Sequence, residues 1–149
     1  MPGVVLDWGA KCCVNNLPAI WNFKATCEKY GMDYASAAGT IAFAMELYQR
    51  GIISAKDTDR LELEWGNENA ISMLLEKIVF RRGFGDILAE GSLRAAKLIG
   101  KGADQYTVEI KGAVPAGTYM PTFSRGVIFS PRLIPSSPLS FQDFLGWRL

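Results

Sequence analysis

The sequence predicts a mainly α fold: a multi-helix orthogonal bundle of about four to six helices, with short extended segments and an irregular C-terminal tail. Two observations lead to this prediction. Apolar residues recur three and four positions apart through much of residues 16–100, and glycines or capping residues stand at the ends of these runs. Five of the seven prolines lie in residues 113–149, where the helical spacing disappears. We therefore expect a helical domain over residues 1–112 and an irregular, Pro/Ser-rich tail over residues 113–149.

The first predicted helix covers residues 16–30. Asn16 can cap it, Pro18 falls in the first turn where its missing N–H is harmless, and Gly31 ends it. Its apolar residues are three and four apart, so they share one face. That face consists of Ile20, Phe23, Cys27 and Tyr30.

The second predicted helix covers residues 33–50 and stops at Gly51. It is apolar nearly all round from Ala35 to Ala44, which is typical of a central, buried helix. It has more apolar faces than a four-helix body can cover. We therefore expect an exposed hydrophobic patch on this helix, or self-association through it into a homo-oligomer.

The segment "LELEW", residues 61–65, alternates apolar and acidic side chains, as in a short strand or an extended edge segment. Gly66 and Asn67 then open a third helix over residues 67–82.

The motif Gly83-Phe84-Gly85 breaks the third helix, and Asp86 can cap a fourth helix over residues 86–99. A dinucleotide fingerprint would need a third glycine where Leu88 stands, and it would follow a strand rather than a helix. The motif is therefore interpreted as a turn between helices. Residues 105–111 look extended.

Composition narrows the classes of function. The 149 residues are 49% hydrophobic and 21% charged, which is typical of one globular domain. With a net charge of +1 and no basic cluster among aromatics, a nucleic-acid partner is not expected. No apolar run approaches the roughly 20 residues of a membrane span, and no leader is visible. The three cysteines, two of them adjacent, form no disulfide framework, which favours a cytoplasmic location.

The residue types limit the chemistry further. The chain has no histidine, which removes the commonest general base and the commonest zinc ligand. Cys12 and Cys13 are adjacent, a poor geometry for chelating one metal ion. Cys27, on the first predicted helix, is interpreted as a small buried residue. No metal site and no catalytic residue are predicted within the chain. A thiol redox role for Cys12 or Cys13 stays open as a weaker alternative.

The stretch "CEKYGMDYAS", residues 27–36, permits two interpretations. In the structural one, Gly31 ends one helix and Asp33 caps the next. In the functional one, Glu28 and Asp33 accept hydrogen bonds from the N–H-rich edge of a pterin ring, since charge-assisted bonds are the stronger kind. Spacing alone does not choose between them.

Three strings occur together in one order: "IAFAMELY", "LEWGN" and "GFGDILAEG". With their surroundings, roughly residues 9–112, they resemble the middle helical domain of the tungsten-containing aldehyde ferredoxin oxidoreductases. The pterin-contacting motif of that family, Asp-x-x-Gly-Leu-Asp, stands here as Glu28-Lys29-Tyr30-Gly31-Met32-Asp33. The resemblance therefore implies that Glu28 and Asp33 contact the cofactor and that Gly31 forms the turn.

The intact enzymes of this family carry a tungsten or molybdenum bis-pterin beside a four-iron–four-sulfur cluster. They oxidise aldehydes to carboxylic acids and pass electrons to ferredoxin. The resemblance does not extend to the β-rich domain, the cluster cysteines or the histidine-bearing segments of the family. The chain thus resembles a fragment or subunit that contributes one wall of the pterin site, inactive alone and able to bind no cofactor by itself. The missing domains or subunits and ferredoxin are the expected partners, and a non-catalytic helical packing or interaction module is the alternative.

Overall fold

The computed structural model describes residues 2–108, most of which lie in helices. No strand occurs in this part of the chain, so the prediction of a mainly α, multi-helix fold is confirmed. The predicted irregular tail, residues 113–149, lies outside the described residues. In chain order the elements are α1 (Pro2–Val5), the π-helical turn η1 (Leu6–Ala10), α2 (Leu17–Lys29), α3 (Tyr34–Gln49), α4 (Glu68–Val79), α5 (Phe84–Leu88), α6 (Ser92–Ile99) and the 3-10 turn η2 (Ala103–Tyr106).

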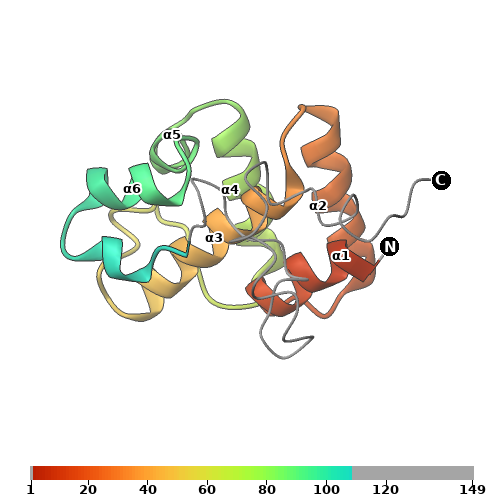
Figure 1. Cartoon of the computed structure of the whole chain (residues 1–149), viewed down its shortest axis with the longest axis horizontal. Coiled ribbons are helices and arrows are strands. Elements are labelled where there is room, and N and C mark those ends of the chain that lie inside the picture. Colours follow the sequence, from red (N-terminus) through yellow and green to blue (C-terminus); the bar gives the residue numbers. More distant parts are fainter. Residues whose placement is uncertain (1, 109–149) are drawn as a thin grey trace, which may run out of the picture.

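Helix α3 crosses the middle of the molecule, with α1 and α2 at one end and α5 and α6 at the other (Figure 1). It contacts η1, α2, α4, α6 and η2. Small side chains let these neighbours come close: Ala38 and Ala44 are fully buried. The prediction of a central, buried helix is confirmed.

The predicted exposed patch on this helix is wrong. The exposed large apolar side chains of residues 2–108 all lie outside α3. The physical reason is that α1 and η1, which were not predicted from the sequence, are present, and η1 packs on α3. Val4 and Trp8 from these two elements are fully buried.

Helices α2 and α4 lie side by side and run in the same direction (Figure 1). At their amino ends, Asn16 Nδ2 donates a hydrogen bond to Glu68 Oε2 at 2.9 Å. At their carboxyl ends, the rings of Tyr30 and Phe80 meet edge to face with centroids 5.6 Å apart. The predicted capping role of Asn16 is wrong, because its side chain makes no cap hydrogen bond. Its amide is used to join the two helices instead.

The segment over residues 61–65 shows the predicted alternation without becoming a strand. Leu61 and Leu63 are buried, while Glu62 and Glu64 are exposed. Asn67 caps α4 as expected, accepting a hydrogen bond from the backbone N–H of Ala70 at 3.1 Å.

The fourth predicted helix, residues 86–99, is two helices. Gly91 has φ +85°, a conformation that other residues rarely adopt, and it separates α5 from α6. The predicted cap Asp86 lies inside α5 instead. In the segment predicted to be extended, residues 105–111, Gln105 and Tyr106 belong to η2. Residues 109–111 lie outside the described part.

The glycines of Gly83-Phe84-Gly85 are required by close packing. A Cβ at Gly85 would lie 2.3 Å from the carbonyl carbon of Lys77, and one at Gly83 would lie 2.1 Å from Asp59 Oδ2. The same Asp59 oxygen accepts hydrogen bonds from the backbone N–H of Phe84 at 2.9 Å and from Lys77 Nζ at 3.0 Å. The motif is a packing turn between α4 and α5, as its sequence context indicated.

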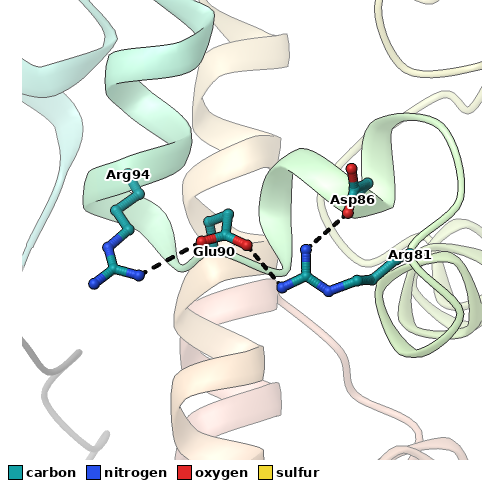
Figure 2. A network of polar contacts seen from close by, with 4 residues as sticks. All are labelled: Arg81, Asp86, Glu90 and Arg94. Atoms are coloured by element: carbon teal, nitrogen blue, oxygen red, sulfur yellow. Dashed lines mark hydrogen bonds and ion pairs between the residues drawn. The ribbon is translucent and has the colours of Figure 1, made fainter.

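A charged network joins the α4–α5 turn to the start of α6 (Figure 2). The guanidinium of Arg81 lies between Asp86 Oδ1, at 2.8 Å, and Glu90 Oε1, at 2.7 Å. Glu90 Oε2 in turn pairs with Arg94 at 3.5 Å. Glu90 therefore uses both carboxylate oxygens within the chain.

Among the described residues, no helix is both long enough and apolar enough to cross a membrane.

Candidate cofactor-binding site at the α2–α3 turn

The carboxyl end of α2 closes in a Schellman motif. Gly31 has φ +69°, the backbone N–H of Met32 donates to Cys27 O at 2.8 Å, and that of Gly31 donates to Glu28 O at 3.2 Å. A Cβ at Gly31 would meet nothing within 4 Å, so only the backbone conformation selects glycine here. Gly31 ends the helix as predicted.

Asp33 caps the next helix. Its Oδ2 accepts a hydrogen bond from the backbone N–H of Ser36 at 2.7 Å, as expected from sequence. The side chain is exposed. Within residues 2–108, Asp33 Oδ1 accepts no hydrogen bond, and the carboxylate forms no ion pair with a described cation.

Glu28 lies on the last full turn of α2, with its side chain 59% exposed. Its Oε1 pairs with Lys24, one helical turn earlier, and the Lys24 side chain is only 15% exposed. Lys24 also approaches the ring of Trp21, with Nζ 6.0 Å from the ring centroid. Glu28 Oε2 has no partner among the described side chains.

Both carboxylates act on the same buried thiol. Burial raises the pKa of Cys27 to about 11, with smaller contributions from Asp33 and then Glu28. Cys27 is fully buried, so its interpretation as a small core residue is confirmed. Both negative groups thus act on one thiol at the end of α2.

Tyr34, the first residue of α3, borders this acidic turn. Its pKa is raised by burial first, then by the negative charges of Asp7 and Asp33. Glu28 adds a smaller contribution of the same sign. The phenol therefore lies near both candidate carboxylates and near a third acid from the amino-terminal segment.

The donor chemistry of the turn fits a ligand edge rich in N–H groups. Among the described residues, each of the two exposed carboxylates keeps one oxygen without a partner, and a carboxylate oxygen can only accept hydrogen bonds. The turn offers no metal-binding set: no group of three or more His, Cys, Asp or Glu side chains in residues 2–108 could hold a metal ion.

The thiols near the amino terminus are poorly suited to redox chemistry. Cys12 is fully buried and its Sγ–H donates to Ala38 O at 3.5 Å. Burial raises the pKa of its thiol to about 12, so the reactive thiolate is scarce at neutral pH. Cys13 is exposed but has no second available thiol beside it.

Sequence reasoning missed two ion pairs around this turn. Lys24 is four residues before Glu28, and this spacing was a usable signal on a predicted helix. Asp7 and Lys11 form a second pair, with Asp7 Oδ1 2.7 Å from Lys11 Nζ. No helix was expected there, so nothing in the pattern indicated that these two side chains meet.

Comparison with known proteins identifies the family. The family model described as aldehyde ferredoxin oxidoreductase, domains 2 and 3, matches residues 4–130. The chain belongs to the aldehyde ferredoxin oxidoreductase family. The match contains the whole α2–α3 turn and runs past residue 112, where the predicted helical domain ends.

Curated proteins are also similar to this chain over about 90 residues. The chain is 42% identical to the tungsten-containing aldehyde ferredoxin oxidoreductase of Pyrococcus furiosus over 93 residues, and these residues are 62% of this chain. The enzyme of the same name from Thermococcus kodakarensis is 39% identical over 93 residues, again 62% of this chain. The WOR-like subunit of aliphatic sulfonate oxidoreductase from Pyrococcus furiosus is 45% identical over 89 residues, 57% of this chain and 14% of that protein. The matched segment spans 15% of the length of each of the first two relatives.

A solved structure matches the fold as well. It is described as the active site complex BamBC of benzoyl-coenzyme A reductase in complex with 1,5-dienoyl-CoA. The TM-score is 0.68 at 36% sequence identity, covering 76% of this chain and 17% of that one.

Proposed function

We propose that the chain forms one wall of the pterin site in an oxidoreductase of this family that carries a tungsten or molybdenum bis-pterin. The observation that carries the proposal is the pair of exposed carboxylates, Glu28 and Asp33, on either side of the Gly31 turn. Each keeps one oxygen without a partner among the described residues.

In this proposal the two acids orient the ring system. The uncommitted oxygens Glu28 Oε2 and Asp33 Oδ1 accept hydrogen bonds from ring N–H donors. Hydrogen bonds to a carboxylate are worth about 1.5–3 kcal/mol each. The longer Glu28 stands where the family motif has aspartate, and its pair with Lys24 restrains the extra methylene. When bound, the bis-pterin metal and the iron–sulfur cluster supply the redox chemistry by which an aldehyde becomes a carboxylic acid.

The remaining parts of the site belong, in this proposal, to other domains or subunits. Catalysis requires a preorganised and enclosed site, and Glu28 and Asp33 supply only one side of it. The chain is therefore expected to be inactive alone and to act together with the polypeptide that holds the cluster. Ferredoxin is the proposed electron acceptor.

The test is to isolate the tagged chain with its native partners and to measure tungsten, molybdenum and pterin per chain. Metals are quantified by mass spectrometry and pterin by fluorescence after oxidation. We expect Glu28→Gln and Asp33→Ala to reduce pterin content while the partner polypeptides stay bound.

Two matched variants control for structural effects. Glu46→Gln removes a pair of residues four apart at the end of α3, with Arg50 just after the helix, and Asn67→Ala removes a similar cap on α4. Both should leave pterin content unchanged. Pterin content at the wild-type level in both site variants would refute the proposal.

One observation favours the non-catalytic alternative, a helical packing or interaction module. Asp33 caps α3 and Gly31 closes α2, so both residues have structural roles without any ligand. This alternative predicts that Asp33→Ala and Asn67→Ala each cost about 1 kcal/mol of stability and have no other effect. A functional complex that contains neither pterin nor metal would support it.

A further inference from the structure

A buried ion pair lies behind the α2–α3 turn. Asp7 is 1% exposed and the Lys11 side chain 16% exposed, and the carboxylate oxygen and the ammonium are 2.7 Å apart. Both belong to the amino-terminal segment, Asp7 within the π-helical turn η1 and Lys11 immediately after it. The proposed contacts Glu28 and Asp33 do not by themselves require this pair.

Stability alone is a poor explanation for the pair. Removing two charges from water costs about as much as their attraction returns, so apolar residues of similar volume are often as stable in such a position. The turn that carries Asp7 is π-helical, a rare form that is frequent at functional sites.

The pair reaches the first turn of α3. Lys11 Nζ donates to the backbone carbonyl oxygen of Ala35 at 3.4 Å. The negative charge of Asp7 acts on the phenol of Tyr34, the residue directly after Asp33. Lys11 thus meets the first turn of α3 at the buried Ala35, while Asp33, the cap just before this turn, is exposed.

We propose that Asp7 and Lys11 are positioning residues that hold the first turn of α3, and with it Asp33, in place relative to Glu28. This inference rests on the proposed pterin site. It assigns the amino-terminal segment a role in aligning the two carboxylates, in addition to covering the core.

The first experiment uses the full chain alone and needs no cofactor. In the double variant Asp7→Leu/Lys11→Met, the amides of Ser36 and Ala37 at the start of α3 should lose protection from hydrogen exchange. The amide of Ile71, which donates to Asn67 O at 3.0 Å in the first turn of α4, should keep its protection. A variant that merely weakened the whole fold would lower protection at all three amides.

A control breaks a more exposed ion pair at the start of another helix. Asp59→Asn/Lys77→Met removes the pair that holds the first turn of α5, where Asp59 accepts from the backbone N–H of Phe84. Protection at Ser36 should be unchanged in this control. Lys11→Arg keeps a donor for Ala35 and should preserve protection at Ser36.

The second experiment measures pterin per chain in the complex purified with its partners. We expect Asp7→Leu/Lys11→Met to retain roughly tenfold less pterin, as is typical when residues supporting a binding group are lost. The control pair at Asp59 and Lys77 should retain the wild-type amount. If the double variant does not fold, Asp7→Asn/Lys11→Met, which also removes the contact to Ala35, is judged by the same two readings.

The two proposals fail in different ways. Normal Ser36 protection and normal pterin content in a folded double variant would overturn the positioning role. If Glu28→Gln and Asp33→Ala lose pterin while the double variant keeps it, the positioning role also fails but the site proposal stands. If the Glu28 and Asp33 variants keep their pterin, the site proposal fails, and the positioning role for that site fails with it.

Discussion

Two turns between helices use their acidic residues differently. At the α4–α5–α6 corner, Glu90 pairs with Arg81 and Arg94 through separate oxygens, and Arg81 also pairs with Asp86 (Figure 2). At the α2–α3 turn, Glu28 forms an ion pair with one lysine, Lys24, and Asp33 has no cationic partner among the described residues. The acids of the first corner are paired within the chain, whereas each carboxylate of the second keeps one oxygen without a partner among the described residues.

The glycines of the two turns also differ, in how closely other atoms approach them. Gly85 is required by a backbone 2.3 Å from its potential Cβ, while Gly31 has open space around it. The packed turn at Gly85 has no room for an added side chain, whereas the turn at Gly31 has room beside its backbone. Mutations can test that contrast.

The largest expected effect is at the packed corner. Gly85→Ala places a methyl group against the Lys77 backbone, which cannot move without shifting α4 away from α5. Overpacking of this kind costs about 3 kcal/mol. Urea unfolding of the full chain measures it, and a loss below about 1 kcal/mol would contradict the close packing.

Acid should weaken the packed corner through Asp59. The hydrogen bond from the Phe84 backbone N–H, and then the one from Lys77, lower the pKa of this carboxyl in the folded state. The unfolded chain therefore binds the proton more readily. The stabilisation that the ionised Asp59 gives to the folded state is thus present above roughly pH 5 and declines as pH falls below about 4. Asp59→Asn should cost about 1 kcal/mol at pH 7 and less near pH 3. Unfolding curves at both pH values test this, and an equal loss at both would contradict it.

A loss smaller than that of Gly85→Ala is expected at the open turn. Gly31→Ala meets no steric contact but must hold φ near +69°, which costs about 1 kcal/mol. Thermal unfolding compared with Gly85→Ala measures the difference between the two turns. Equal losses for the two variants would contradict the difference in packing between the two turns.

The smallest effect is expected for Glu28→Gln in the chain alone. The pair with Lys24 is largely exposed on the Glu28 side, and such pairs four residues apart contribute about 0.3 kcal/mol. Unfolding by urea should barely distinguish this variant from wild type, although we expect its pterin content in the complex to fall. A loss of stability above about 1 kcal/mol would indicate a mainly structural role.

Helices with clear spacing and caps could be predicted from the sequence. Asp33 before α3 and Asn67 before α4 each have a polar side chain ahead of an apolar run, and both form the expected cap. The split between α5 and α6 was missed because an apolar pattern continues across Gly91, while the conformation of that glycine depends on packing.

The amino-terminal helix could not be predicted. Residues 2–10 contain Pro2, Gly3 and Gly9, which have low helical propensity, and their helical form depends on packing against the rest of the fold. The Asp7–Lys11 pair could therefore not be anticipated either. Glu28, Gly31 and Asp33 were assigned to a pterin by resemblance, because their spacing alone fits a simple turn equally well.

The same-direction packing of α2 and α4 has an electrostatic consequence. Helices that lie side by side in this way bring their partial negative carboxyl ends together, so their macrodipoles repel each other. Two cations offset this: Lys29 Nζ lies 5.1 Å from the ring centroid of Tyr30, and the Arg82 guanidinium lies 5.1 Å from that of Phe80. The aromatic contact between the helices thus has a positive charge at each ring, close to where the two dipoles end.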